Sequence, residues 1–163
     1  MPRFNICDTK FVEYNEQISD DIFLHKSKDI ANPVKLNPCQ VRQLFILLES
    51  IDEEANILWK ELTSFDDKRE HSLHIGWKYY LTVMVFRGLR YYDIRRWWMA
   101  PGRIEPTPTK TGIRLSQFEM NNLRDFQVRL FESMTAIRNI GPCNCYSDDL
   151  QYLMCSRCNP MWE

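Results

Sequence analysis

The sequence predicts an α+β fold made of two strand-strand-helix units whose two long helices pack together. The stretch V-K-L-N-P-C-Q-V-R-Q-L (residues 34–44) aligns with I-R-L-S-Q-F-E-M-N-N-L (residues 113–123). Each copy begins a run with apolar residues at every third or fourth position, which is typical of a helix with one buried face, and strand-like runs precede it. With 163 residues and 44% hydrophobic content, the chain can form one compact domain or two small units that share a core.

The first unit is predicted to span residues 1–62. Strand-like runs lie at residues 10–14, 22–26 and 34–36. Asn37 is a good helix N-cap and Pro38 suits the first helical position, so a helix of about six turns is expected after them. Its buried face is expected to carry Val41, Leu44, Phe45, Leu48, Ile51, Ala55, Leu58, Trp59 and Leu62.

A connector is predicted at residues 63–76, which are rich in charge and show neither helical nor strand periodicity. His71 and His74 are spaced to share one side of it, and no cysteine stands beside them in sequence. We therefore interpret both histidines as connector surface.

The second unit is predicted to span residues 77–140. Strand-like runs lie at residues 78–86, 90–99 and 113–115, and residues 101–112, with three prolines and two glycines, read as a loop. Ser116 is the expected N-cap of the second long helix. The apolar set of that helix is Met120, Leu123, Phe126, Leu130, Phe131, Met134 and Ile137.

Charge divides the chain into an acidic front and a basic back. Residues 1–76 hold 9 Lys and Arg against 14 Asp and Glu, a net charge of −5, whereas residues 77–163 hold 12 against 8, a net charge of +4. The basic residues of the second unit alternate with aromatic ones. Such a surface can stack bases while it neutralises phosphates, as sequence-tolerant single-strand binders do. The alternative is an ordinary solvated surface, because the excess of cations is modest.

Several function classes find no support in the sequence. No run of eighteen apolar residues is present, and the first residues lack the order of a signal peptide, so an intracellular protein is expected. The glycines form no phosphate-binding loop, and no nucleophile stands beside a base. We therefore predict that the protein is not an enzyme.

A family resemblance is carried by three motifs and the capped helix that follows them. The motifs are F-R-G (residues 86–88), D-I-R-R-W-W-M (residues 93–99) and G-I-R-L (residues 112–115). Residues 78 to about 138 resemble the transcriptional coactivator positive cofactor four. The first unit resembles that family only at K-L-N-P and its helix. The resemblance implies curved antiparallel sheets, a pseudo-dimer formed by divergent tandem duplication, and a nuclear protein that binds single-stranded DNA or melted duplex in transcription or replication.

The resemblance also implies a set of binding residues. Phe86 and Trp98 match base-stacking rings, and Arg87 and Arg95 match cations that face the strand. Three family cations are replaced here, by Met84, Leu89 and Thr111. The full predicted nucleic-acid set is Lys78, Phe86, Arg87, Arg90, Arg95, Trp98, Lys110 and Arg114.

The direction of the two adjacent tryptophans is open. Strict strand alternation puts Arg95 on the same face as Trp97, whereas the family pattern puts Arg95 with Trp98, which requires a bulge. Both rings could instead be core residues. We expect Trp98 to be exposed for binding.

A tail is predicted at residues 141–163. Its four cysteines, Cys143, Cys145, Cys155 and Cys158, lie within 16 residues and suggest a structural zinc site, although they could also be unligated thiols.

Three further alternatives remain at the level of sequence. The chain could be a protein-interaction adaptor of the transcription machinery, docked through its acidic first half, whose sheet no longer binds strands. The ligand could be RNA, since the same surface would serve. The two units could pair within one chain or with a second copy as a homodimer. A viral or mobile-element origin would fit the divergence.

Overall fold

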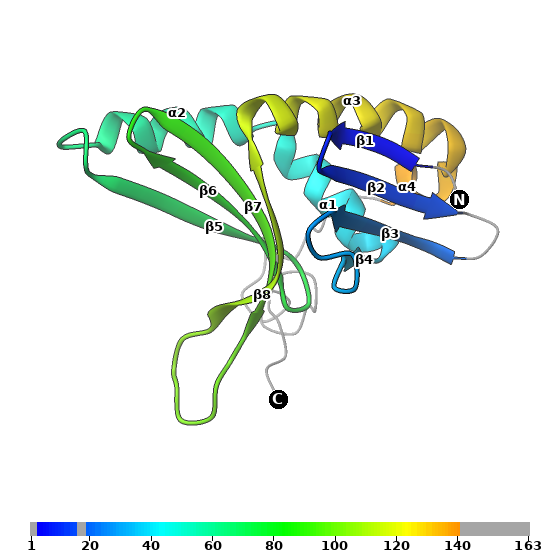
Figure 1. The fold of residues 1–163 in the computed structure, drawn as a ribbon, viewed down its shortest axis with the longest axis horizontal. Coiled ribbons are helices and arrows are strands. Elements are labelled where there is room, and N and C mark those ends of the chain that lie inside the picture. Colours follow the sequence, from blue (N-terminus) through cyan, green and yellow to red (C-terminus); the bar gives the residue numbers. More distant parts are fainter. Residues whose placement is uncertain (1–2, 16–18, 141–163) are drawn as a thin grey trace.

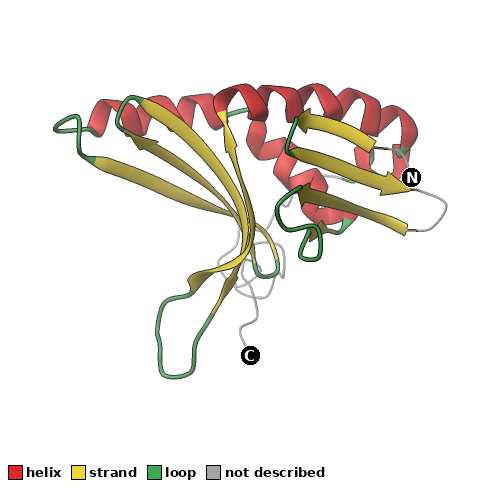
Figure 2. Cartoon of the chain, in the orientation of Figure 1, coloured by secondary structure: helices red, strands yellow, loops and turns green. Residues whose placement is uncertain are grey.

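The computed structural model describes residues 3–15 and 19–140, which form two four-stranded antiparallel sheets, each followed by helices. The strand orders are β1-β2-β3-β4 and β5-β6-β7-β8, so all neighbours in each sheet are also neighbours in sequence (Figures 1 and 2). The first unit comprises β1 (Arg3–Cys7), β2 (Lys10–Asn15), β3 (Ser19–Lys26), β4 (Val34–Leu36), α1 (Pro38–Leu48) and α2 (Ile51–Glu61). The second comprises β5 (Lys68–Gly76), β6 (Tyr79–Phe86), β7 (Leu89–Trp98), β8 (Thr107–Ser116), α3 (Gln117–Ser133) and α4 (Thr135–Arg138).

The same capping device starts the main helix of each unit. Asn37 accepts a hydrogen bond from the backbone of Gln40, whose side chain accepts one from the backbone of Asn37. Ser116 and Glu119 make the matching reciprocal pair at the start of α3. Both caps expected from the sequence are confirmed, and each satisfies amides that a helix start leaves without partners.

The helices of each unit reach across to the other sheet. Helix α2 follows the first sheet in sequence but packs against β5 and β6 of the second sheet. Helix α1 packs against β5 as well as its own β3 and β4, and α3 packs against β1 of the first sheet as well as its own β7 and β8. Figure 1 shows α2 and α3 in one row, with both sheets on the same side of that row. The fold is therefore the expected α+β pair of sheet-and-helix units, arranged as in a pseudo-dimer within one chain.

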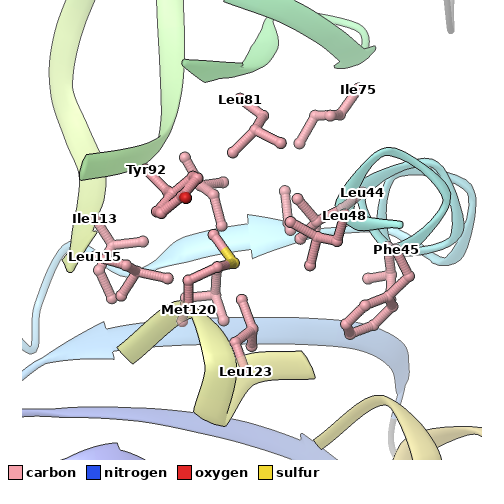
Figure 3. Close-up of a cluster of buried hydrophobic side chains, with 14 of the residues drawn as sticks. Leu44, Phe45, Leu48, Ile75, Leu81, Tyr92, Ile113, Leu115, Met120 and Leu123 are labelled. Carbon is pink, nitrogen blue, oxygen red and sulfur yellow. The ribbon is translucent and has the colours of Figure 1, made fainter. Parts of the chain in front are cut away.

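A single hydrophobic core joins the two units. Figure 3 shows Leu44 and Leu48 of α1 close to Leu81 of β6 and to Met120 of α3. Tyr92, at 0% exposure, is the largest of the fully buried side chains in this core. Because residues from both sheets and all three long helices share this core, removal of either unit would expose apolar surface of the other.

Two strands and one helix break were not expected. Strand β1 precedes the first predicted run, and β5 occupies most of the stretch predicted as a connector, so the prediction of irregular structure at residues 68–76 was wrong. The single six-turn helix was also wrong, because α1 ends at Leu48 and α2 starts at Ile51. Residues 107–112 of the predicted loop belong to β8. None of the described helices is long and apolar enough to cross a membrane.

Candidate nucleic-acid interface

One face of the second sheet is turned away from the helices, and we call it the outer face. The register fixes which side chains it carries, because residues directly opposite each other in an antiparallel pair share a face. Leu81 and Ile94 are opposite each other and lie in the core, so their neighbours Thr82 and Asp93, also opposite each other, point outward. By this register the outer face includes His74, Tyr80, Thr82, Met84, Tyr91, Asp93, Arg95 and Arg114.

Three aromatic side chains form a row across β5, β6 and β7 on the outer face. The ring centres of His74 and Tyr80 are 5.0 Å apart, and those of Tyr80 and Trp97 are also 5.0 Å apart. The Nε1 atom of Trp97 is buried and has no hydrogen-bond partner among the described residues. A buried indole N–H without an acceptor costs free energy, so the Trp97 ring is held by its packing and not by a hydrogen bond of this group.

Arg95 lies flat across the outer face and is held on both sides. Its Nε and Nη2 atoms donate to Asp93 at 2.8 and 3.0 Å, and Nη1 donates to the carbonyl oxygen of Thr109 at 2.8 Å. Gly112 stands opposite Arg95 on β8, and a Cβ there would come within 2.5 Å of the guanidinium carbon. The glycine of the G-I-R-L motif thus leaves room for the arginine side chain.

A hollow of about 230 Å³ lies on the outer face. Lys68, near the start of β5, and Trp97, near the end of β7, both line it, which indicates that the sheet bends around it. Asp93 lies within it and is only 5% exposed, with Arg95 bonded to it and Arg114 at 3.9 Å. The full lining is Lys68, Glu70, Thr82, Met84, Asp93, Arg95, Trp97, Pro108 and Arg114.

A family model described as Transcriptional Coactivator p15 (PC4) matches residues 73–126, from the end of β5 to the middle of α3. Residues 73–126 are a PC4-like unit. The match contains the aromatic row, the Arg95 clamp and the second capping box. It confirms the family that the sequence motifs indicated, and it relates this part of the chain to transcriptional coactivators.

The fold of the whole chain also resembles a solved structure. A crystal structure of a protein of unknown function, from the DUF155 family of Prochlorococcus sp. NATL2A, superposes with a TM-score of 0.52 and 8% sequence identity. The likeness covers 80% of this chain and 99% of that one. It shows a shared fold that extends beyond the PC4-like unit. No curated protein matches this chain.

Some of the predicted binding residues lie at exposed positions of the PC4-like unit. The side chain of Arg114 is 57% exposed on the outer face, and Lys110 is exposed on β8. Phe86 is half-buried at the end of β6, and the Arg87 guanidinium stands 5.0 Å from the centre of its ring. Arg87 and Gly88 both have positive φ angles, 49° and 76°, as the tight turn of a two-residue hairpin requires. The F-R-G motif is therefore a turn motif as well.

Two other predicted binding residues, Arg90 and Lys78, make contacts away from the hollow on the outer face. Arg90 shares the core side of the sheet with Val85 and reaches α2, where it contacts the Asn56 side chain and stands 5.4 Å from the centre of the Trp59 ring. Lys78 lies at the turn before β6, with its ammonium 4.9 Å from the centre of the Trp77 ring. The sheet itself therefore does not bring Arg90 to the outer face, and its role in binding stays a prediction.

Of the two adjacent tryptophans, the structure places Trp97 with Arg95. Both line the outer hollow, as strict alternation along β7 requires. The bulge that the family pattern would require is absent from β7, and the irregularity falls in β8 instead, where the register jumps from Gly112 to Pro108. Of the two directions that the sequence left open, the structure therefore follows strict alternation, and Trp98 does not share the face of Arg95. Trp98 is nevertheless 49% exposed, as expected, at the end of β7.

The corresponding face of the first sheet is balanced in charge. Arg3 lies 3.7 Å from Glu13, and Lys35 lies 3.4 Å from Asp21. Phe11 is covered by the Arg3 guanidinium at 3.8 Å and is only 7% exposed. The first sheet also carries a row of rings, since the ring centres of Phe11 and His25 are 4.8 Å apart and those of His25 and Phe23 are 6.3 Å apart.

The predicted zinc ligands Cys143, Cys145, Cys155 and Cys158 lie outside the described residues, so zinc remains a proposal. Within residues 3–15 and 19–140 no group of three or more His, Cys, Asp or Glu side chains could hold a metal ion. The two cysteines there are Cys7 and Cys39, and both are free thiols.

Sequence reasoning missed Lys68, Glu70 and Tyr80. The first two were assigned to the connector, and Tyr80 was read only as part of a strand. The signal that could have found them is the alternation of β5, K-R-E-H-S-L-H-I-G, in which Lys68, Glu70 and His74 occupy every second position together with Ser72.

Proposed function

We propose that the protein binds single-stranded nucleic acid, with DNA as the primary ligand, on the outer face of the PC4-like unit, and that it acts without catalysis in transcription or replication. The observation that carries this proposal is the aromatic row ending at Trp97. It lies on a face that also presents the exposed cation Arg114 and is turned away from the core.

The chemistry of this face suits a single strand better than a duplex. Unpaired bases offer flat faces that can stack on Trp97 and Tyr80, and such stacking contributes about 1–3 kcal/mol per base. The same bases are inaccessible inside a duplex. Phosphates can reach Arg114, Lys110 and Lys68, whose charges are only partly compensated by the acids nearby.

Arg95 is proposed to act indirectly. Its guanidinium is engaged by Asp93 and by the carbonyl of Thr109, so little of its donor capacity is left for a phosphate. Its fixed side chain forms part of the floor of the hollow, over which the strand would bind.

A second candidate is a protein-interaction adaptor of the transcription machinery. A groove of about 490 Å³ lies where α2, the β6–β7 turn and the start of α3 meet. It is lined by Trp59, Leu89 and Phe118, whose side chains are 38%, 54% and 70% exposed. Exposed apolar side chains gathered in one groove are typical of surfaces that bind protein partners.

Fluorescence anisotropy with labelled oligonucleotides tests the proposal. Purified protein is titrated into labelled (dT)20, the matching duplex and (rU)20, each at two salt concentrations. Saturable binding to (dT)20 that exceeds duplex binding and weakens with salt is expected. No binding to (dT)20 or (rU)20 at low salt would remove this proposal and leave the adaptor. Equal or stronger binding of (rU)20 would make RNA the ligand.

A further inference from the structure

The hollow on the outer face contains two carboxylates, which a surface built only for phosphates would not contain. Asp93 is neutralised by Arg95, at 2.8 Å, and approached by Arg114. Glu70 is different, because the one described ion pair it makes is with Lys68 at 3.7 Å, and its side chain is 54% exposed. A carboxylate at the rim of this hollow is available to a ligand.

The size and walls of the hollow suit one planar ring. Its volume of about 230 Å³ is below the ~300–1,000 Å³ of pockets that hold drug-sized molecules. Trp97, Pro108 and Met84 give it flat or apolar walls, while Thr82 adds a hydroxyl group. A single nucleobase of a bound strand fits this description, and a dinucleotide does not.

The polar groups around the hollow match one base better than the others. An ionised carboxylate can only accept hydrogen bonds. Guanine alone presents two adjacent donors, N1–H and the N2 amino group, on its Watson–Crick edge, whereas adenine and cytosine place an acceptor nitrogen beside their single amino group. Guanine O6 and N7 are acceptors that suit Lys or Arg, and Lys68 and Arg114 both line the hollow.

We propose that this hollow receives one guanine base of the bound strand, with Glu70 accepting from N1 and N2 and with Lys68 or Arg114 donating to O6 or N7. This inference rests on the proposed binding of single strands and adds a base preference to it. The preference comes from Glu70, whereas general affinity comes from the aromatic row and the exposed cations.

Single-base substitution within one oligonucleotide tests this preference. Labelled 15-mers of dT that carry one central dT, dG, dC or deoxyinosine are titrated by anisotropy, and a single dG avoids structures made of several guanines. The dG oligonucleotide is expected to bind roughly tenfold more tightly than all-dT, the low end of what a bidentate base contact gives at a partly exposed site. Deoxyinosine lacks the N2 amino group and is expected to fall between the two.

Glu70→Gln is the matched variant, and Glu132→Gln, an equal charge change at an exposed position of α3, is its control. Glu70→Gln is expected to abolish the dG preference while all-dT affinity stays the same or rises, because a negative charge is lost. Equal binding of all four oligonucleotides by the wild-type protein, or a dG preference that survives Glu70→Gln, would overturn the inference while the proposed function stands. Failure of every oligonucleotide to bind would overturn both.

Discussion

The contact made by Glu119 joins the two units, and its removal should destabilise the protein. Glu119 lies in the first turn of α3, yet its carboxylate accepts hydrogen bonds from Cys7 at 2.9 Å and from the Lys10 ammonium at 2.9 and 3.0 Å, both in the first unit. It also accepts from the backbone N–H of Ser116 at 2.9 Å. Glu119→Gln keeps the shape of the side chain and removes its charge.

The pKa of Glu119 gives the magnitude. Burial acts to raise this pKa, but the hydrogen bonds from Cys7, Ser116 and Lys10 together outweigh it and hold the pKa at about 2, against an ordinary value of 4.5. At about 1.4 kcal/mol per pKa unit, ionised Glu119 contributes about 3 kcal/mol to the free energy of unfolding. Because the pKa is lowered by folding, this contribution is fully present above pH 4.5 and is lost as the pH falls toward 2.

Urea denaturation followed by circular dichroism measures this contribution. At pH 7 Glu119→Gln should unfold with a free energy lower by about 3 kcal/mol, and the difference from wild type should shrink steadily between pH 4.5 and pH 2. Glu132→Gln, exposed on the same helix, should behave as wild type at every pH. A Glu119→Gln protein that matches wild type at pH 7, or a difference that does not change on acidification, would show that Glu119 does not make this contribution.

Three further outcomes are expected. Gly112→Ala should displace the Arg95 side chain from Asp93 and cost about 1–3 kcal/mol of stability, and unchanged thermal unfolding would contradict the clamp. Residues 68–140 expressed alone, which keep all four strands of the second sheet, should fail to give a cooperative unfolding transition, since α1 and α2 would no longer cover β5 and β6; a well-folded fragment would show that the units are independent. Binding of (dT)20 should weaken with salt with a logarithmic slope of roughly −2, which is about −0.7 for each of Lys68, Lys110 and Arg114, and Arg114→Glu should reduce that slope by at least about 0.7, whereas a salt-insensitive affinity would exclude phosphate contacts.

The elements that could be predicted from the sequence are those with strong local signals. The two main helices begin at capping residues and continue with apolar residues at helical spacing. The central strands carry apolar and aromatic runs. Strand β5 carries only the weak signal of its alternating residues, because it lies at the edge of its sheet and Ile75 and Gly76 are its buried positions. Strand β1 is short and begins in exposed residues.

The candidate site could likewise be predicted from the sequence only in part. Alternation along β7 correctly groups Trp97 with Arg95, whereas the bulge inferred from the family pattern misplaced Trp98, because the extra residues are in β8. The engagement of Arg95 by Asp93 follows from their spacing of two residues on one strand. The direction of Arg90 toward α2 could not be predicted, because it depends on the packing of a helix of the first unit against the second sheet.

The central claim is that a single strand lies on the outer face beside Trp97, and paired tryptophan variants test it most directly. Affinity for labelled (dT)20 is compared among wild type, Trp97→Ala, Trp98→Ala and Trp59→Ala, the last of which lies in the apolar groove near α3. Trp97→Ala should weaken binding roughly 5- to 100-fold, because one stacked base is lost. Trp98→Ala should weaken binding less, and Trp59→Ala should leave it unchanged. Wild-type affinity in Trp97→Ala, with a loss in Trp59→Ala instead, would place the strand on another surface and contradict the account.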